Sequence, residues 1–411
     1  MITETRIVEG VDGRSAIVER PDAHADLMTV NMGPQHPSTH GVLRVILTLD
    51  GETVVDAVPE IGYLHTGIEK TIQCKRYEAA LTCTDRMDYL SPLANNLVYC
   101  LAVEDLLGVD VPVRATWLRT LLVELTRIAS HLVWLGTHAL DLGAMTVFLY
   151  CFRERELILD LFEELTGQRM MTSYIRFGGL EQEAPDGWLD RVRKVNDSFP
   201  SHVDEYERLL TRNGIWKERL QGVGVISGEE ALHYGMTGPS LRGSGVDWDL
   251  RKKQPYLVYD QLDFRVPVYP QGDCYARYIC RIEELRESQR LVQQCLKLLP
   301  SGPIRSDDRK VVPPPKEELA SSMEAVIHHF KLLTEGLHPP VGEVYRAVES
   351  PRGELGVFLV SDGSNKPRRC HVRAPSFANL QALPRLCRGH LVADVVAIIG
   401  SIDIVLGEID R

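Results

Sequence analysis

A long stretch of apolar residues at helical spacing constrains the fold of this chain more than any other feature of its sequence. Between residues 86 and 166 the apolar side chains recur every three or four positions, most regularly at Trp117, Leu118, Leu121, Leu122, Leu125, Ile128, Ala129, Leu132 and Leu135. This period is typical of an α-helix with one buried stripe, and a stripe of that length needs other helices to cover it. The sequence therefore predicts a central bundle of long helices.

Shorter elements are predicted on both sides of this bundle. Before it, three segments have the residue pattern of strands, and Asp50-Gly51 between the last two predicts a β hairpin; the segments are 27–31, 42–49 and 53–58. After it, the pattern predicts two polar-faced helices within 186–213, a glycine-rich loop at 222–245 and two further helices at 274–299 and 316–334. Three strand-like pieces follow at 342–348, 355–361 and 369–372, and a last apolar run lies at 392–402. This mixture favours an α+β fold. We expect residues 1–60 to form a β-rich region and residues 61–411 a helical core with C-terminal α/β segments, packed as one intertwined unit.

The composition is typical of a soluble globular protein. No run of eighteen apolar residues that could cross a membrane occurs. Residues 1–22 mix charges of both signs, unlike a secretory or transit peptide, so we expect a cytoplasmic location. The formal net charge of −11 argues against nucleic acid as a partner, because nucleic-acid binding generally needs a basic surface.

The nine cysteines do not have the spacing of a metal-binding site. No two of them stand three positions apart, so the chain has no C-x-x-C pair of the kind that binds zinc or an iron–sulfur cluster. We expect reduced and mostly buried thiols, with no metal or cofactor bound by this chain alone.

A short segment with two histidines, residues 33–41, is the first candidate for chemistry. It reads Gly-Pro-Gln-His-Pro-Ser-Thr-His-Gly and places His36 and His40 four residues apart, with Thr39 between them. The prolines and flanking glycines disfavour a helix, so we expect a loop between two strands. Such a loop either presents proton donors to a ligand or is only a polar turn, and the residues leave both interpretations open.

Polar residues at the two ends of the predicted helices are the second candidate. Arg86 and Tyr89 stand at the start of an apolar helix, where Asp85 is suited to cap the helix but the other two are not explained by capping. Asp141 lies near the end of the longest apolar helix, where a carboxylate opposes the helix dipole. A carboxylate there should have a cationic or hydrogen-bond-donor partner, either in a structural salt bridge or at a functional site.

Eight segments together resemble the D-type family of bacterial respiratory complex I, the proton-pumping NADH:quinone oxidoreductase. They lie at 33–41, 61–67, 86–89, 152–156, 174–179, 238–245, 350–356 and 397–411. These motifs extend over nearly the whole chain, and a set of matching motifs as long as this is highly specific for one family. The family is equivalent to the mitochondrial 49-kilodalton subunit. The resemblance implies the subunit that forms the quinone site, to which electrons pass from a terminal 4Fe–4S cluster in a partner subunit.

The resemblance also implies roles for individual residues. Tyr89 and His40 would hydrogen-bond the quinone head group and supply its protons, with His36 and Thr39 beside them. Asp141 would pair with His40. A phenol and an imidazole have ordinary pKa values of about 10 and about 6.5, so together they can deliver the two protons that a reduced quinone needs.

The resemblance also implies that the chain works as one subunit of a large complex. Arg86 would approach the terminal cluster, which belongs to a B-type subunit. The other implied partners are C-type and I-type subunits and a membrane-embedded H-type subunit. The chain would be a peripheral protein on the cytoplasmic side of the bacterial plasma membrane, with no membrane span of its own.

The family is in turn similar to the large subunit of nickel–iron hydrogenases, which implies a hydrogenase-like fold. The hydrogenase pattern E-R-x-C-G-x-C, laid on residues 85–91, puts Asp88 and Ser91 at its cysteines. The pattern D-P-C-x-x-C-x-x-R, laid on the C-terminus, puts Val405 and Glu408 there. All four thiolates that would hold nickel are missing, which argues against a catalytic hydrogenase subunit. A noncatalytic scaffold that keeps the same fold is the other alternative.

One position departs from the family pattern. Many relatives carry a histidine three residues before the tyrosine of Tyr-Ile-Arg-x-Gly-Gly, and this chain has Met171 there, ahead of Tyr174. Without a titrating imidazole beside the cluster, we expect the reduction potential of the cluster to depend only weakly on pH. A low-potential quinone such as menaquinone would suit that change.

Overall fold

The computed structural model of the protein describes residues 5–9, 15–19, 27–34 and 42–411. Two short strands, β1 (Thr5–Glu9) and β2 (Ser15–Glu19), pair with each other in antiparallel fashion. The next three strands form an antiparallel sheet in the order β3-β4-β5, with bounds Leu27–Met32, Arg44–Asp50 and Thr53–Glu60. These strands confirm the predicted β hairpin. Val45, Leu47 and Leu49 of β4 are buried, as an alternating strand pattern requires.

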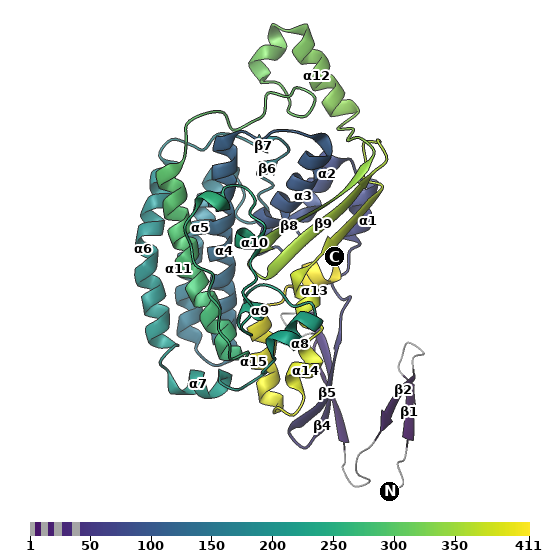
Figure 1. The fold of residues 1–411 in the computed structure, drawn as a ribbon, viewed down its shortest axis with the longest axis vertical. Coiled ribbons are helices and arrows are strands. Elements are labelled where there is room, and N and C mark those ends of the chain that lie inside the picture. Colours follow the sequence, from purple (N-terminus) through teal and green to yellow (C-terminus); the bar gives the residue numbers. More distant parts are fainter. Residues whose placement is uncertain (1–4, 10–14, 20–26, 35–41) are drawn as a thin grey trace.

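Five long helices form the centre of the molecule (Figure 1). They are α3 (Pro92–Leu107), α4 (Val113–Asp141), α5 (Met145–Thr166), α6 (Trp188–Leu209) and α11 (Cys274–Leu298). Helix α4 packs against α3, α5 and α11, while α6 packs against α5 and α11. The apolar stripe of α4 is buried, from Trp117 to Leu135. The central bundle predicted from the 3.6-residue period is confirmed.

A second antiparallel sheet, in the order β10-β9-β8, follows the bundle in the chain and packs on α3. Its strands are β8 (Gly342–Ser350), β9 (Gly353–Ser361) and β10 (Arg369–Arg373). Four short helices complete the C-terminus: α13 (Pro375–Leu380), α14 (Leu383–Cys387), α15 (Val392–Ile402) and α16 (Leu406–Asp410). An isolated bridge between Thr53 and Leu391 joins β5 to this region. Helices and small sheets in one chain confirm the α+β class.

The remaining elements are short and connect these layers. They are α1 (Ile68–Cys74), α2 (Tyr77–Thr84), β6 (Ile175–Arg176), β7 (Gly179–Leu180), α7 (Gly214–Leu220), α8 (Gly228–His233), α9 (Pro239–Arg242), α10 (Leu250–Lys253), η2 (Tyr259–Gln261), η3 (Lys316–Ala320) and α12 (Met323–Thr334). Helix α12 projects beyond the end of the bundle (Figure 1). No helix in the described part of the chain is both long enough and apolar enough to cross a membrane.

Three predictions about local structure were wrong. One long helix, α6 (Trp188–Leu209), stands where two helices were predicted at 186–213; it packs on α5 and α11 and has buried side chains on both sides of Pro200, such as Val192 and Val203. The predicted loop at 222–245 contains α8 and α9; α8 begins at a capping box made by Ser227 and Glu230. The helix predicted at 316–334 is divided into η3 and α12, and Ser322 caps the second piece.

Candidate functional site

Two segments far apart in the sequence meet at residues 85–91, which include the candidates Arg86 and Tyr89. Residues 85–91 connect α2 to α3, and α16 lies against them. A Cβ atom placed on Gly407 of α16 would come within 2.5 Å of the carbonyl oxygen of Met87 and 3.0 Å of that of Arg86. Only glycine permits this approach, so the C-terminus and the segment 85–91 form one site.

The guanidinium of Arg352 lies at the centre of this site. Arg352 occupies the turn between β8 and β9 and is fully buried. Its Nη1 donates to Oδ2 of Asp88 at 2.6 Å and to Oγ of Ser130 on α4 at 3.0 Å, and its Nη2 lies 3.5 Å from Oδ1 of Asp403. Buried charges require partners of opposite sign. Arg352 therefore holds together the segment 85–91, α4 and the end of α15.

Asp403 reaches Arg352 because the chain turns sharply after α15. The residue has a left-handed backbone, with φ of 52°, and it ends the helix. Its other carboxylate oxygen lies 3.8 Å from Nε of Arg281 on α11. A non-glycine residue in this conformation costs free energy, and the two arginines offset that cost.

Asp88 is held on three sides. Besides the bond from Arg352, its Oδ1 accepts a hydrogen bond from the amide of Leu90 at 3.1 Å, and its carbonyl oxygen accepts one from Asn95 at 3.1 Å. Burial raises the pKa of the Asp88 carboxyl, and Arg352 opposes that rise. The carboxylate of Asp88 therefore both stabilises the turn at 85–91 and pairs with Arg352, which also lies close to Asp403.

Glu408, on α16, is the third acid of the site and is almost fully buried. Its Oε1 accepts a hydrogen bond from the amide of Ser376 at 3.0 Å, and Oε2 has no hydrogen-bond partner among the described residues. Burial, and then the charge of Asp88, raise the pKa of Glu408 to about 7. The carboxyl can therefore gain or lose a proton at neutral pH.

Tyr89 and Arg86 are the two predicted site residues in this segment that remain accessible. Tyr89 is half-buried, and its pKa is raised by burial and by the neighbouring Asp88. Its phenol is therefore protonated at neutral pH and can donate. The side chain of Arg86 is exposed and donates to the carbonyl oxygen of Thr82 at 2.5 Å.

Asp85 does not cap the helix as predicted. It follows α2, and the N-cap of α3 is Ser91. Its carboxylate is buried and accepts a hydrogen bond from the hydroxyl of Ser173, because residues 169–174 lie beside the turn. Met171 stands where many relatives have a histidine, two residues before Ser173. The hydrogen bond from Ser173 to Asp85 therefore connects the segment of Met171 to the turn that carries Arg86.

Asp141 is the last residue of α4 and is half-buried. Burial raises the pKa of its carboxyl to about 6 and is the single cause of that rise among the described residues. The predicted partner, His40, lies outside the described residues, as do His36 and Thr39. The pairing of Asp141 with His40 stays a prediction.

Helix α15 connects the surroundings of Tyr89 with those of Asp141. Nε1 of Trp134 on α4 donates to the carbonyl oxygen of Gly400 at 2.7 Å. A Cβ atom on Gly400 would clash with Nδ1 of His138, which precedes Asp141 by less than one helical turn. The end of α15 therefore packs on α4 near Asp141 and also carries Asp403 toward Arg352.

Arg352 and Asp403 lie in the motifs at 350–356 and 397–411, but the sequence predicted no role for either residue and gave no expectation of the network of buried ion pairs behind them. Nε2 of His131 lies 2.9 Å from Glu284, and Arg242 binds both Glu284 and Glu349, the latter at 2.7 Å. Charged residues on the apolar face of α4, such as Glu124 beside Arg127, were the available signal. The described residues contain no group of three or more histidines, cysteines, aspartates or glutamates placed to hold a metal ion.

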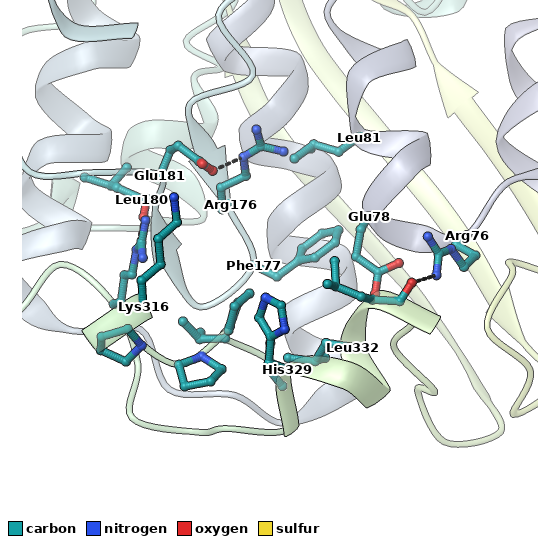
Figure 2. Close-up of a pocket in the computed structure, with 17 residues that line it drawn as sticks. Arg76, Glu78, Leu81, Arg176, Phe177, Leu180, Glu181, Lys316, His329 and Leu332 are labelled. Carbon is teal, nitrogen blue, oxygen red and sulfur yellow. Dashed lines mark hydrogen bonds and ion pairs between the residues drawn. The ribbon is translucent and has the colours of Figure 1, made fainter. Parts of the chain in front are cut away.

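A cavity of about 450 Å³ lies elsewhere, between β6, β7, α2 and the segment that leads to α12 (Figure 2). Apolar side chains such as Phe177 and Leu332 line it, together with Lys316 and an ion pair of 2.7 Å between Arg176 and Glu181. Neither Tyr89 nor Asp141 lines it. The cavity is therefore separate from the site around Arg352.

Comparison with known proteins gives one consistent result. Residues 141–411 match the family described as "Respiratory-chain NADH dehydrogenase, 49 Kd subunit". The chain is 62% identical over 384 residues to the second D-type subunit of the NADH-quinone oxidoreductase of Koribacter versatilis, across 93% of this chain and 96% of that protein. It is 60% identical to the second D-type subunit from Roseiflexus sp., over 94% of this chain and 93% of that one. It is 55% identical to the D-type subunit from Geotalea uraniireducens, over 95% of this chain and the full length of the relative.

Proposed function

The chain belongs to the 49-kilodalton subunit family of the respiratory-chain NADH dehydrogenase, as the D-type subunit of an NADH-quinone oxidoreductase, and from this we propose that it forms the quinone-reducing site of that complex. Electrons reach the quinone from a terminal iron–sulfur cluster of a partner subunit. Tyr89 and His40 bind the head group and give it protons, with His36 and Thr39 beside it. The observation that carries the proposal is the environment of Tyr89, a half-buried phenol whose pKa is raised by burial and by the neighbouring Asp88.

Quinone reduction needs protons that are delivered away from bulk water. Two electrons turn the quinone oxygens into strong bases, and each oxygen then takes up one proton. The raised pKa of Tyr89 makes its phenol a weak acid at rest, and it donates only when such a base forms beside it. This behaviour favours proton transfer to the reduced quinone over loss to solvent.

Asp141 provides the link between this chemistry and proton pumping. Its carboxyl is half-buried, and that burial raises its pKa to about 6, so its ionised form needs a nearby cation to offset the cost of burial. We infer that protonated His40 is that cation and that it loses its proton when the quinone is reduced. The carboxylate of Asp141 is then left without a partner, which is an electrostatic signal to the membrane arm.

The exposed side chain of Arg86 supports its place near the partner's cluster, since among the described residues it donates to one backbone carbonyl oxygen and to no acid. The proposed partners are a B-type subunit that carries this cluster, C-type and I-type subunits, and a membrane H-type subunit. Exposed apolar side chains near Asp141, among them Leu140, Met145 and Leu149, support a covering subunit there. We place the assembled chain at the cytoplasmic face of the bacterial plasma membrane.

We also propose that the fold is that of the nickel–iron hydrogenase large subunit with its metal ligands replaced. The meeting of Gly407 with the segment 85–91 supports this, because the two hydrogenase motifs must face each other across a metal. In this chain Arg352 binds Asp88 where the motif would place a thiolate, and the other motif positions are Ser91, Val405 and Glu408. A catalytic hydrogenase function is disfavoured because no cysteine stands at any of the four positions.

Substitution of Tyr89 tests the proposal. A complex assembled with Tyr89→Phe should keep its subunits and lose about 100-fold or more in quinone reduction, because the phenol proton is gone. Electron transfer from NADH to an artificial acceptor should be unchanged. Tyr99→Phe is the control, since it removes a buried phenol that donates to the carbonyl oxygen of Tyr77 at 3.3 Å.

The noncatalytic scaffold predicts a different result. If this chain only supports its neighbours, the Tyr89→Phe complex should reduce quinone at the rate of the Tyr99→Phe complex. That outcome would reject the proposed role of the site.

A further inference from the structure

Helix α12 carries an exposed apolar stripe. Its members are spaced so that they lie on one face of the helix, and they are between 45% and 80% exposed: Met323, Val326, Ile327, Phe330 and Leu333. The helix packs against η3 and projects beyond the bundle (Figure 1). Apolar side chains gathered on one exposed face are typical of a surface that binds another molecule.

The C-terminal end of α12 is fastened to α2. Nη1 of Arg76 donates to the carbonyl oxygen of Leu333 at 2.8 Å, and Oε1 of Glu78 accepts a hydrogen bond from the amide of Leu337 at 2.6 Å. These bonds satisfy backbone groups at the end of the helix, which its own turns leave open. They therefore hold the stripe in place beside the bundle.

The stripe continues into the cavity of about 450 Å³ (Figure 2). Leu333 belongs to both, and Leu332 and His329 of the same helix also line the cavity. Phe177 and Leu180 line it from the side of β6 and β7. Its volume is within the range of about 300–1,000 Å³ that is usual for binding pockets. The stripe and the cavity thus form one surface, which we call the α12 surface.

The charges that line the cavity are mostly positive. Four cations and two acids line it: Arg76, Arg176, Arg305, Lys316, Glu78 and Glu181. Arg176 pairs with Glu181 at 2.7 Å, and the arginine and the glutamate at the start of α2 cancel each other in net charge. Nε of Arg305 donates to the carbonyl oxygen of Leu180 at 3.0 Å. Within the described ranges no ion pair joins Arg305 or Lys316 to an acid, so these two cations are left over.

Acids close to the cavity do not neutralise these two cations. Glu183 and Glu318 are already paired, with Arg114 at 2.6 Å and with Arg309 at 2.8 Å. Water screens the charges of the exposed acids that do not line the cavity, which are Asp307, Asp308 and Glu317. In a chain with a net charge of −11, a cavity with two unmatched cations favours a negatively charged partner.

We propose that the α12 surface binds an acidic segment of another subunit of the complex. Apolar side chains of that segment cover the stripe, and an aspartate or glutamate enters the cavity and pairs with Lys316 and Arg305. The chain belongs to a family of subunits of a respiratory enzyme, so other subunits are its natural partners. This inference goes beyond the proposed quinone site and does not depend on it.

The shape and charge of α12 favour a protein segment over a small molecule or a membrane. The helix has 12 residues and is therefore about 18 Å long, so a molecule that filled only the cavity would leave most of the stripe exposed. Helices that lie on a membrane surface are rich in lysine and arginine. Helix α12 has one lysine, Lys331, and no arginine.

Photo-crosslinking in the purified complex tests the proposal. Phe330→benzoylphenylalanine should form a covalent link to another subunit, at a segment in which aspartate or glutamate stands among apolar residues, as mapped by mass spectrometry. The same replacement of Ile215, an exposed residue of α7 at the other end of the molecule (Figure 1), should not give this link. A link to a lipid, to a second copy of this chain or to a segment without an acid overturns the inference, and so does the absence of a link.

Charge reversal tests the cavity itself. Lys316→Glu sets an acid against the acid of the partner, so we expect the affinity of the linked subunit for the complex to fall at least about tenfold. Lys316 is exposed, so the substitution should not prevent folding. Lys194→Glu, at an exposed position of α6, is the control and should leave the affinity unchanged. Replacement of the partner's acid by lysine should recover part of the loss in the Lys316→Glu complex. Equal losses in the two variants, or no recovery, overturn the inference.

Discussion

Gly407 lies so close to Met87 that a single added methyl group would meet the carbonyl oxygen of Met87 at 2.5 Å. The two residues are more than three hundred positions apart, and their contact brings the C-terminal helix under the turn that carries Tyr89. This contact places Glu408, Asp88 and Arg352 in one buried site.

The first prediction follows from this approach. Gly407→Ala forces either α16 or the turn to move, because the atom in the way belongs to the backbone. Overpacking of this kind costs about 1–3 kcal/mol, and we expect quinone reduction to fall with it. Thermal inactivation and quinone reductase activity of the assembled complex provide the measurement.

Gly214→Ala is the matched control, since a Cβ atom on Gly214 meets nothing within 4 Å at the start of α7. Equal activity and equal stability of the two variants would contradict the tight contact.

Removal of the central guanidinium should destabilise the protein. Arg352→Met leaves the carboxylates of Asp88 and Asp403 buried without their shared cation, and loss of one partner from a buried ion pair costs about 3–5 kcal/mol. We expect little of the variant to enter the complex, as measured by the amount of this chain in purified complex.

Arg346→Met provides a comparison on the neighbouring strand. Arg346 pairs with Asp105 at the surface, and such pairs contribute about 1 kcal/mol or less. Poor incorporation of both variants would show that the burial of Arg352 is not what matters.

Restoring the family histidine should change the redox behaviour of the partner's cluster. In the protein as it stands, we expect the midpoint potential of that cluster to vary little with pH. In Met171→His an imidazole stands in the segment tied to the turn by Ser173 and Asp85, so the potential should fall by up to about 59 mV per pH unit near neutrality. Redox titration of the complex at several pH values measures both slopes. A strong slope in the unsubstituted protein would show that Met171 does not set it.

Asp141→Asn should separate quinone reduction from proton pumping. The amide keeps the size of the side chain but cannot carry the charge that a carboxyl with a pKa of about 6 carries above that pH. We expect quinone reduction to continue and the number of protons pumped per electron to fall, measured in vesicles that contain the complex. Asp197→Asn, an exposed residue of α6, should leave both unchanged. An active Asp141→Asn complex with normal coupling would remove Asp141 from the pumping mechanism.

Local patterns were sufficient to predict most of the fold. The helical period from Trp117 to Leu135 depends only on neighbouring residues, and so does the alternation in β4, where Val45 and Leu47 are buried. Prediction failed where distant contacts outweighed local preference. Helix α6 continues through Pro200, since it packs on α5 and α11 and has buried side chains on both sides of that proline.

The sequence by itself determined the central bundle, the α+β class and the family, and the resemblance to that family is the source of the roles proposed for Tyr89, His40 and Asp141. Only the tertiary structure decided that Arg352 joins Asp88 to Asp403, that Asp85 accepts from Ser173 instead of capping a helix, and that Glu408 is buried without a cation of its own among the described residues. The reason is physical. A helical stripe or a motif is encoded within a few neighbouring residues, whereas the charge balance of a buried site depends on which distant segments the fold brings together.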